Sequence, residues 1–338
     1  MNPARTSRRY FDETKLLVLE RNDEVKHQYF GQLNEHLNPG DVLVFNRSAT
    51  LPSSFSGRLE RTQQVVELRL AAFQGPEIRQ PQNWLAILFG EGDWRQPTEE
   101  RSQPPPVVEG DLIFISEELR AEILEVRWNR LLRIKFQSQN LVRDLYNMGK
   151  PIQYSYHQEP LEVWDQQTIF SGPPISVEPP SASFQFSWKQ LLELREKGVE
   201  VTTLLHGAGI SSTGNSRLDQ LLPLSEWYQV PLSTMRKIES VREIRKKVVA
   251  VGTTVLRALQ SVYENQKLEG LTSLKIKPET QLAYANALLT GMHEPESSHM
   301  ELLFSFSPRE QILRGYQEAN ALSYRAHEYG DLALLISG

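Results

Sequence analysis

Three side chains in this sequence are candidates for acid–base chemistry: Glu226, His206 and His293. Glu226 lies among aromatic residues in the stretch SEWYQVP. A carboxylate that is partly buried there would have a raised pKa and could act as a general base, although the same carboxylate could equally be solvated. His206 ends an apolar run and His293 lies in HEPESSH. We expect the general base to be one of these three, and the sequence does not choose among them.

Two short loops could bind a ligand. The loop His206-Gly207-Ala208-Gly209 follows a predicted strand at 199–205 and offers flexible backbone N–H groups for an anion or a hydroxyl, although such glycines often form only a turn. Tyr329-Gly330-Asp331 precedes a final apolar run. Its Asp331 could accept a hydrogen bond from a ribose or an amine, or could be an ordinary turn aspartate.

No standard metal motif is present. Of the seven histidines only His293 and His299 lie close together, and Pro295 interrupts the helix that a zinc pair would need. The sequence contains no cysteine, which excludes thiolate metal sites, disulfides and a cysteine nucleophile. We therefore expect no metal site.

The segment that must position these groups is Val248 to Ser261, VVAVGTTVLRALQS. Its apolar run predicts a strand buried on both faces, and a helical pattern follows at once. Thr253 or Thr254 can cap this helix, and Gly252 allows the tight turn before it. Such a turn exposes backbone N–H groups at the carboxyl end of a sheet, where Arg257 could also reach. The alternative is an ordinary strand–helix unit that binds nothing.

The rest of the chain predicts a mixed α/β main domain with a small β-barrel inserted in it. Apolar strands are expected at 15–20, 41–45, 274–276 and 332–336, and helices are expected after the capping residues Ser187 and Ser233. Between them, short alternating segments are separated by Gly, Pro and charged turns, as in a barrel. We expect an α/β domain at 1–54 and 150–338 and a barrel domain at 55–149.

The charge and hydropathy of the chain limit the classes of function that the protein can have. The net charge of −5 gives no global footprint for nucleic acid, and no run approaches a membrane span. The N-terminal stretch MNPARTSRRYFDETK lacks the apolar region of a signal peptide. We expect a cytoplasmic protein without a membrane partner.

In this order the motifs resemble one family, the S-adenosylmethionine:tRNA ribosyltransferase-isomerases of queuosine biosynthesis. Val251-Gly252-Thr253-Thr254 with Arg257 is similar to the family's VGTTSVR stretch, and Leu43-Val44-Phe45-Asn46 to its LVFNDTRVIP segment. The loop at 207–209, the Ser225-Glu226 segment, the stretch from His293 to Ser298 and the segment at 324–331 match four further family motifs in the same order. The resemblance runs from about Asp12 to Gly338.

The resemblance implies the fold expected above and a reaction. The ribosyl part of S-adenosylmethionine is transferred to an aminomethyl-deazaguanine at the tRNA wobble position and isomerised to an epoxycyclopentane, with release of adenine and methionine. The sulfonium acidifies the C5′ protons so that a base can remove one, and the leaving adenine must be protonated or stabilised. The implied substrate-binding residues are Asn46, Gly207, Ala208, Gly209, Gly252, Thr253, Thr254, Arg257, Ser297, Tyr329 and Asp331.

This sequence departs from the family pattern at several polar positions. A family histidine is replaced by Gln185, which cannot transfer a proton at neutral pH. A second histidine of the family pattern is replaced by Leu205, and His206 follows one place later. On a strand, neighbouring side chains point to opposite faces, so His206 would not take the place of that histidine. Two arginines of the family pattern are replaced by Ala49 and Ser54, which weakens the argument for a phosphate-binding site.

Three hypotheses follow. The chain is a tRNA ribosyltransferase-isomerase with a changed site, a paralogue that binds S-adenosylmethionine but uses another, small-molecule acceptor, or a non-catalytic nucleoside- or RNA-binding protein. In each the partner is S-adenosylmethionine or a related nucleoside, with tRNA as the further partner in the first, and we expect a monomer. Release of adenine and methionine with and without tRNA separates the three.

Overall fold

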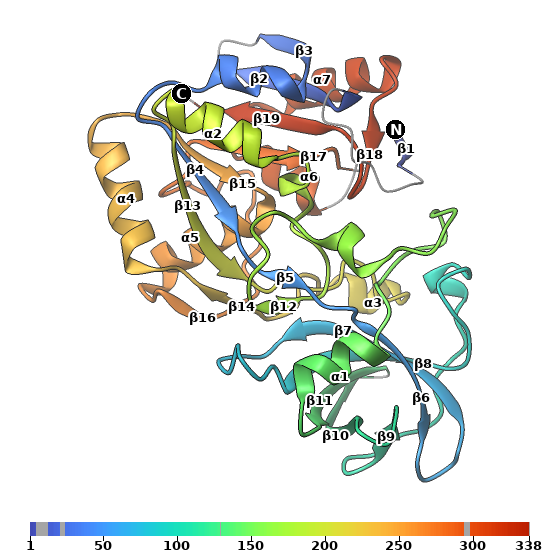
Figure 1. The fold of residues 1–338 in the computed structure, drawn as a ribbon. Coiled ribbons are helices and arrows are strands. Elements are labelled where there is room, and N and C mark those ends of the chain that lie inside the picture. The colour runs from blue at the N-terminus through green and yellow to red at the C-terminus, as the bar shows by residue number, and fades with distance from the viewer. Residues whose placement is uncertain (5–12, 21–23, 129, 294–297, 338) are drawn as a thin grey trace.

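The computed structural model describes residues 1–4, 13–20, 24–128, 130–293 and 298–337. Two parts are evident in Figure 1: a large sheet flanked by helices and a small barrel beside one end of it. Both belong to one mixed α/β architecture with a closed antiparallel barrel, so the predicted fold class is confirmed. In the described ranges, no helix is both long enough and apolar enough to cross a membrane.

The large sheet has nine strands in the order β16-β14-β13-β4-β15-β17-β19-β2-β3. Its central strands β13, β4, β15 and β17 run parallel to one another, so their carboxyl ends meet at one edge. The other neighbouring pairs are antiparallel, except for the parallel pair β19 and β2. The strands are β2 (Lys15–Glu20), β3 (Val25–Tyr29), β4 (Val42–Asn46), β13 (Glu200–His206), β14 (Glu226–Gln229), β15 (Val248–Val251), β16 (Glu269–Thr272), β17 (Ala287–Gly291) and β19 (Leu332–Ile336).

Helices cover both faces of this sheet, which explains why β15 is apolar at every position and β4 is apolar from Val42 to Phe45. In β4, Val42 and Val44 join the core under the helices α4 (Leu232–Glu243), α5 (Thr253–Asn265) and α7 (Arg309–Ala321). Leu43 and Phe45 point the other way, into the core beneath α2 (Trp188–Glu196) and the 3₁₀ helix η2 (Phe30–His36). Two buried faces therefore hold β4 in register.

The barrel closes in the strand order β10-β11-β8-β7-β6-β9. Its strands are β6 (Ser54–Leu59), β7 (Val65–Phe73), β8 (Asn83–Phe89), β9 (Leu112–Phe114), β10 (Arg120–Trp128) and β11 (Leu131–Gln137), and α1 (Leu141–Met148) follows them. Phe55, Trp84 and Phe136 fill its interior. The same core continues into Leu205 and Trp227, so barrel and sheet share buried side chains. The predicted division at 54/55 and 149/150 stays a prediction.

The barrel contains a cluster of buried charged residues that was not predicted from the sequence. Arg69, Arg101 and Arg130 place their guanidinium carbons 5.1, 5.0 and 4.9 Å from the centre of the Phe89 ring. Glu67 forms ion pairs with two of these arginines, with Arg69 Nε at 2.6 Å and with Arg101 Nη2 at 2.5 Å. All four charged residues are buried.

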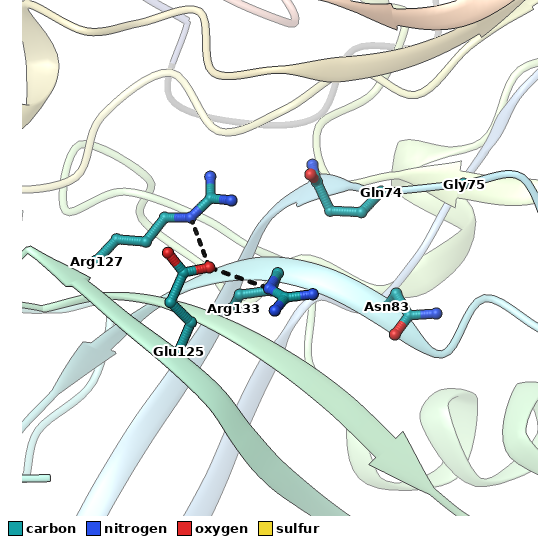
Figure 2. Close-up of a pocket in the computed structure, with 6 residues that line it drawn as sticks. All are labelled: Gln74, Gly75, Asn83, Glu125, Arg127 and Arg133. Carbon is teal, nitrogen blue, oxygen red and sulfur yellow. Dashed lines mark hydrogen bonds and ion pairs between the residues drawn. The ribbon is translucent and has the colours of Figure 1, made fainter. Parts of the chain in front are cut away.

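A surface concavity of about 530 Å³ lies on the outside of the barrel. Figure 2 shows that its two arginines, Arg127 and Arg133, both point to Glu125, with Nε-to-oxygen distances of 3.3 and 3.1 Å. Gln74, also in its lining, donates to the backbone oxygen of Ser225. Since these charges are exposed and satisfy one another, we assign this concavity no chemistry.

The remaining elements are short. β1 (Asn2–Pro3) pairs with β18 (Arg325–Ala326), and β5 (Ala49–Thr50) pairs with β12 (Pro174–Ser176). Two further helices are α3 (Ser216–Asp219) and α6 (Ser298–Leu303), and the 3₁₀ turns are η3 (Thr98–Glu100), η4 (Val163–Gln166) and η5 (Ser181–Ser183).

Several local predictions hold and three are wrong. The strands at 15–20 and 332–336 are present, and Ser187 caps α2 in a capping box with Gln190. No strand forms at 274–276, because β16 ends at Thr272. Ser233 lies inside α4, whose cap position is Pro231. The cap of α5 is Gly252, with a φ of 98°, rather than Thr253 or Thr254.

Candidate active site

The candidate site lies at the carboxyl edge of the parallel strands, where open α/β sheets bind ligands. β4 ends at Asn46, β13 at His206 and β15 at Val251, next to the start of α5. The turn into α5 needs a positive φ at Gly252, which a residue with a Cβ rarely adopts. This turn brings the first backbone N–H groups of α5, which have no partner within the helix, to the same edge.

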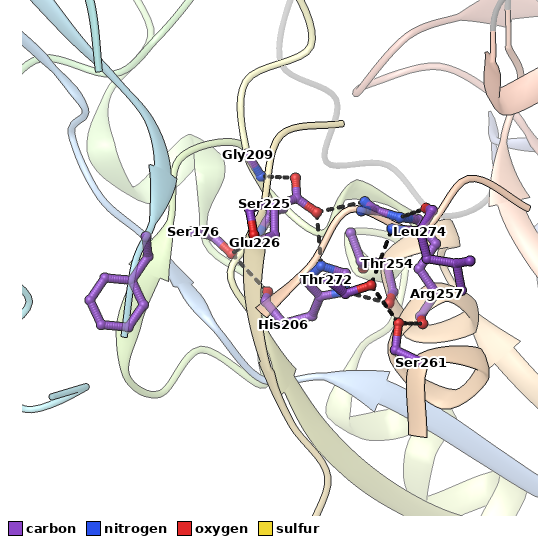
Figure 3. Close-up of polar contacts among 12 residues, drawn as sticks. Ser176, His206, Gly209, Ser225, Glu226, Thr254, Arg257, Ser261, Thr272 and Leu274 are labelled. Carbon is purple, nitrogen blue, oxygen red and sulfur yellow. Dashed lines mark hydrogen bonds and ion pairs between the residues drawn. The ribbon is translucent and has the colours of Figure 1, made fainter. Parts of the chain in front are cut away.

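A buried charged triad forms the centre of the site (Figure 3). His206 Nε2 lies 2.9 Å from Glu226 Oε2, and Arg257 Nη1 donates to that same oxygen at 2.6 Å. The other carboxylate oxygen, Oε1, accepts the backbone N–H of Gly209 at 2.7 Å. His206, Glu226 and Arg257 are all buried. The predicted acid–base residues His206 and Glu226 are therefore in direct contact.

The ring of His206 has a hydrogen-bond partner at each nitrogen. Its Nδ1 lies 2.6 Å from the backbone oxygen of Thr254, which can only accept. Its Nε2 faces the Glu226 carboxylate, which is also an acceptor when ionised. Both ring nitrogens therefore face acceptor atoms, and the ring is held in one orientation between them.

The expectation of a raised pKa at Glu226 is wrong. Burial by itself raises the pKa of this carboxyl, but the charge of Arg257, the hydrogen bond from His206 and the N–H of Gly209 outweigh it and hold the pKa at about 2. Glu226 is thus ionised at neutral pH and is a poor general base. It is better suited to orient His206, whose Nε2 lies 2.9 Å from its Oε2.

Asn46 fixes the backbone of His206. Its Oδ1 accepts the N–H of His206 at 3.0 Å, and its Nδ2 donates to the His206 carbonyl at 2.8 Å. Ser48 and Ser176, whose hydroxyls lie 2.5 Å apart, also reach this carbonyl. The structure therefore gives Asn46 a positioning role, since both its amide ends have partners in the chain.

The loop after His206 does not offer free N–H groups, contrary to expectation. Gly207 donates to the backbone oxygen of Trp227 at 2.9 Å, and Ala208 donates to the Ser176 hydroxyl at 3.1 Å. Gly209 donates to Glu226, and a Cβ on it would lie 2.6 Å from both Glu226 Oε1 and the Ala71 carbonyl. The loop's glycines are needed for this close packing against the triad.

The unused donors lie at α5 instead. Arg257 donates from Nε to the Leu274 carbonyl at 3.0 Å, while its Nη2 is buried and has no hydrogen-bond partner among the described residues. The N-terminus of α5, with Thr253 and Thr254, adds backbone N–H groups and the positive end of the helix dipole. Together they make a suitable site for an anionic or hydroxyl group of a ligand.

Two stacked imidazoles lie near enough to Arg257 for its charge to act on one of them. His293 and His299 stack with ring centres 4.9 Å apart, and His293 Nε2 lies 2.8 Å from the Thr290 hydroxyl. Burial, followed by the positive charge of neighbouring histidines, lowers the pKa of His293 well below its ordinary value. Burial and then the charge of Arg257 lower the pKa of His299. Both are therefore neutral at pH 7 and able to accept a proton.

The remaining predicted residues have other partners. Tyr329 stacks on Phe184 with ring centres 5.3 Å apart. Asp331 is buried, and its two oxygens accept the N–H groups of Lys15 and Arg325 at 2.8 and 2.7 Å, which ties β19 to its neighbours. Ser297 lies outside the described residues.

Sequence reasoning missed two polar groups. His299 was considered only as a metal ligand, and within the described ranges no group of three or more His, Cys, Asp or Glu side chains could hold a metal ion. Glu178, in the loop after β12, was not considered. A carboxylate between Val177 and the prolines at 179–180 was the available signal.

Comparisons with known proteins identify the family of this chain. The sequence matches the family described as Queuosine biosynthesis protein over residues 2–335. It is 31% identical over 329 residues to the S-adenosylmethionine:tRNA ribosyltransferase-isomerase of Aquifex aeolicus (strain VF5), covering 95% of this chain and 92% of that protein. The enzyme of the same name from Desulfitobacterium hafniense is 30% identical over 338 residues, covering 96% of this chain and 93% of its own length.

The fold also has a solved counterpart. The crystal structure of S-adenosylmethionine tRNA ribosyltransferase from Thermotoga maritima aligns with a TM-score of 0.53 at 24% identity, covering 99% of this chain and 96% of that one. At this identity the likeness supports the fold alone. The sequence matches carry the assignment, and they show that this chain belongs to the queuosine biosynthesis protein family.

Proposed function

We propose that this protein transfers the ribosyl part of S-adenosylmethionine to the aminomethyl-deazaguanine of a tRNA and isomerises it to the epoxycyclopentane, releasing adenine and methionine. The family match supports this hypothesis over the small-molecule paralogue and the binding protein. S-adenosylmethionine is then a substrate, and no bound cofactor takes part. A tRNA acceptor places the reaction in the cytoplasm, and we propose a monomer as the active unit.

The observation that carries the mechanism is the charged triad beside neutral imidazoles. His206, held by Glu226, is the proposed acid that protonates or stabilises the departing adenine. The neutral ring of His293 or His299 is the proposed base that removes a C5′ proton from the sulfonium donor. The spare Nη2 of Arg257 and the N-terminus of α5 are the proposed anchor for the donor. Gln185 then replaces a family histidine without removing every proton carrier.

Product release tests this function directly. The protein is incubated with S-adenosylmethionine, with and without tRNA that carries the aminomethyl-deazaguanine base, and adenine and methionine are quantified. We expect stoichiometric release of both only when that tRNA is present. Release without tRNA would favour the small-molecule paralogue, and S-adenosylmethionine binding without release would favour the binding protein.

Arg257→Ala is expected to weaken S-adenosylmethionine binding by about 1.5–3 kcal/mol, the usual contribution of a hydrogen bond to a charged group. Titration calorimetry measures this change, and circular dichroism confirms that the variant is folded. Arg236→Ala removes an exposed arginine on α4 and serves as the control. An affinity for the donor equal to that of the wild type would remove Arg257 from the binding site.

A further inference from the structure

The loop after β13 is held by four consecutive backbone N–H groups, each of which donates to a different segment of the chain. The donors are Ala208, Gly209, Ile210 and Ser211, and the acceptors in the same order are Ser176 Oγ, Glu226 Oε1, the Ala71 carbonyl and Glu178 Oε1, at 3.1, 2.7, 2.9 and 2.8 Å. Of these bonds, the one from Gly209 reaches the triad (Figure 3). The place of Gly209 therefore depends on the bonds made by its neighbours on either side.

Glu178, a partly buried carboxylate, is the outer anchor of this loop. Its Oε1 accepts three hydrogen bonds, from the Ser211 N–H at 2.8 Å, from the Ser211 hydroxyl at 2.9 Å and from the Tyr154 hydroxyl at 2.5 Å. An ionised carboxylate accepts such bonds more strongly than a protonated one, because hydrogen bonds to a charged group are about twice as strong as neutral ones. The hold on Ser211 is therefore firmest when Glu178 carries its charge.

Backbone contacts limit the loop on its other sides. Val177 donates its N–H to the Ala208 carbonyl at 2.7 Å. The register of β7 against β8 shifts at Ala71, as at a β-bulge, and the Ala71 carbonyl accepts the N–H of Ile210 at 2.9 Å. A Cβ on Gly209 would lie 2.6 Å from that same carbonyl, so the loop is already in close contact with the barrel. The barrel fixes one side of the loop, and the side-chain bonds of the outer anchor fix its last residue.

The charge of Glu178 depends on the groups that face it. Burial, followed by the nearby charge of Glu328, raises the pKa of Glu178 to about 7, while the hydrogen bonds from Tyr154 and Ser211 act in the opposite direction. Tyr154 itself keeps its proton, because burial and then the charge of Glu178 raise its pKa well above the ordinary value. The other titratable groups of this cluster surround Glu328 and are Tyr156, His157 and His327. Glu178 therefore gains its charge as the pH rises through the neutral range.

We propose that Glu178 is a positioning residue for the reaction: when ionised, it holds the loop at 208–211 so that Gly209 keeps Glu226 in place against His206. Glu178 acts through Ser211 and Gly209, and its role is to orient the proposed acid rather than to exchange a proton with a substrate. When it is protonated, its bonds to Ser211 weaken, and the bond from Gly209 to Glu226 is held less firmly. Activity should then rise as Glu178 ionises. This inference rests on the proposed function for its activity measurement.

The pH profile of adenine release tests this role. At saturating S-adenosylmethionine and tRNA, kcat is expected to rise about ten-fold between pH 6 and pH 8, as the ionised fraction of a group with a pKa of about 7 does. Glu178→Gln keeps an acceptor oxygen but has no charge, so its kcat should stay at the low-pH level of the wild type. Its dissociation constant for S-adenosylmethionine should stay within about two-fold, since Glu178 contacts neither Arg257 nor α5. Glu310→Gln, at an exposed position on α7, should keep the wild-type profile.

Two neighbouring substitutions should move this rise in opposite directions, which a merely structural role of Glu178 would not produce. Tyr154→Phe removes a hydrogen bond that lowers the pKa of Glu178, so the rise should shift to higher pH. Glu328→Gln removes the charge that raises this pKa, so the rise should shift to lower pH. Both variants keep Glu178 itself and serve as the test if the glutamine variant at 178 folds poorly. Shifts of the same sign, or no shift in either variant, would overturn the proposal.

The amide resonance of Gly209 measures the same coupling without turnover. In proton–nitrogen NMR spectra it should move with pH around neutrality in the wild type and stay fixed in Glu178→Gln, and a resonance that stays fixed in both would overturn the proposal. If the wild type releases no adenine with tRNA but this resonance follows Glu178, the proposed function is wrong and the positioning role stands. If adenine release depends on tRNA but neither kcat nor the resonance depends on Glu178, the positioning role is wrong and the function stands.

Discussion

Glu226→Gln is expected to lower kcat for adenine release by about 10²–10⁴-fold, the range associated with losing a positioned acid or base. The carboxylate accepts hydrogen bonds from His206, Arg257 and Gly209 at once, and none of these three groups can accept one in return. A neutral amide has a single acceptor oxygen, so its NH₂ group would face another donor. His206 would then lose its anionic partner at Nε2.

Pre-steady-state measurement of adenine release checks this expectation, with Glu239→Gln on the exposed face of α4 as the matched control. S-adenosylmethionine affinity is measured in parallel, because the triad also holds Arg257. A variant with kcat within three-fold of the wild type would show that His206 needs no charged partner, and the acid would have to be sought elsewhere.

The same substitution should change how stability depends on pH. Glu226 has its pKa held at about 2, below its ordinary value of 4.5, so its ionised form stabilises the fold above the ordinary value. That contribution is lost as the pH falls toward 2. The difference in unfolding free energy between wild type and Glu226→Gln should therefore be largest near neutral pH and shrink below about pH 4.

Glu67→Gln is expected to destabilise the protein by about 3–5 kcal/mol, the usual cost of breaking a buried ion pair by removing one partner. Glu67 is the carboxylate that pairs with Arg69 and Arg101 inside the barrel, and its pKa is lowered because their charges outweigh the effect of burial. Without it, three guanidinium groups around Phe89 remain buried with no counter-charge among them.

Urea denaturation followed by circular dichroism measures this loss, and Glu109→Gln, at an exposed position, is the control. The double variant Glu67→Gln/Arg101→Met should recover part of the stability, because it removes one of the uncompensated charges. A single variant as stable as the control would mean that water or an anion already neutralises the arginines. Activity is expected to follow the folded fraction, since Glu67 lies outside the triad.

The sheet was predictable because its signals are local. The apolar runs at 41–45 and 248–251 predicted strands, the second of them buried on both faces, and both are central strands. The cap of α5 was not predictable from its threonines. Gly252 takes that position with a positive φ and leaves Thr254 to offer its backbone oxygen to His206.

The sequence allowed the three residues of the triad to be proposed individually, but it did not predict their contact. Its members come from β13, β14 and α5, and their contact depends on the antiparallel register that pairs His206 with Tyr228. The pKa of Glu226 was predicted in the wrong direction for the same reason, because the pattern SEWYQVP shows its apolar neighbours but not its cationic partners. Tertiary contacts of this kind leave no trace in local spacing.

The order of strands in the large sheet has a consequence for synthesis on the ribosome. Leu16 of β2 pairs with Leu332 of β19, and Val42 of β4 pairs with Val248 of β15 and Glu200 of β13. The strands β2 and β4 are therefore synthesised long before their partners. Until those partners emerge, their apolar side chains stay exposed and their backbone groups stay unpaired. The barrel strands pair only among themselves, so they can close first. The inserted barrel gives the nascent chain a folded unit while the sheet around it is still awaiting its last strand.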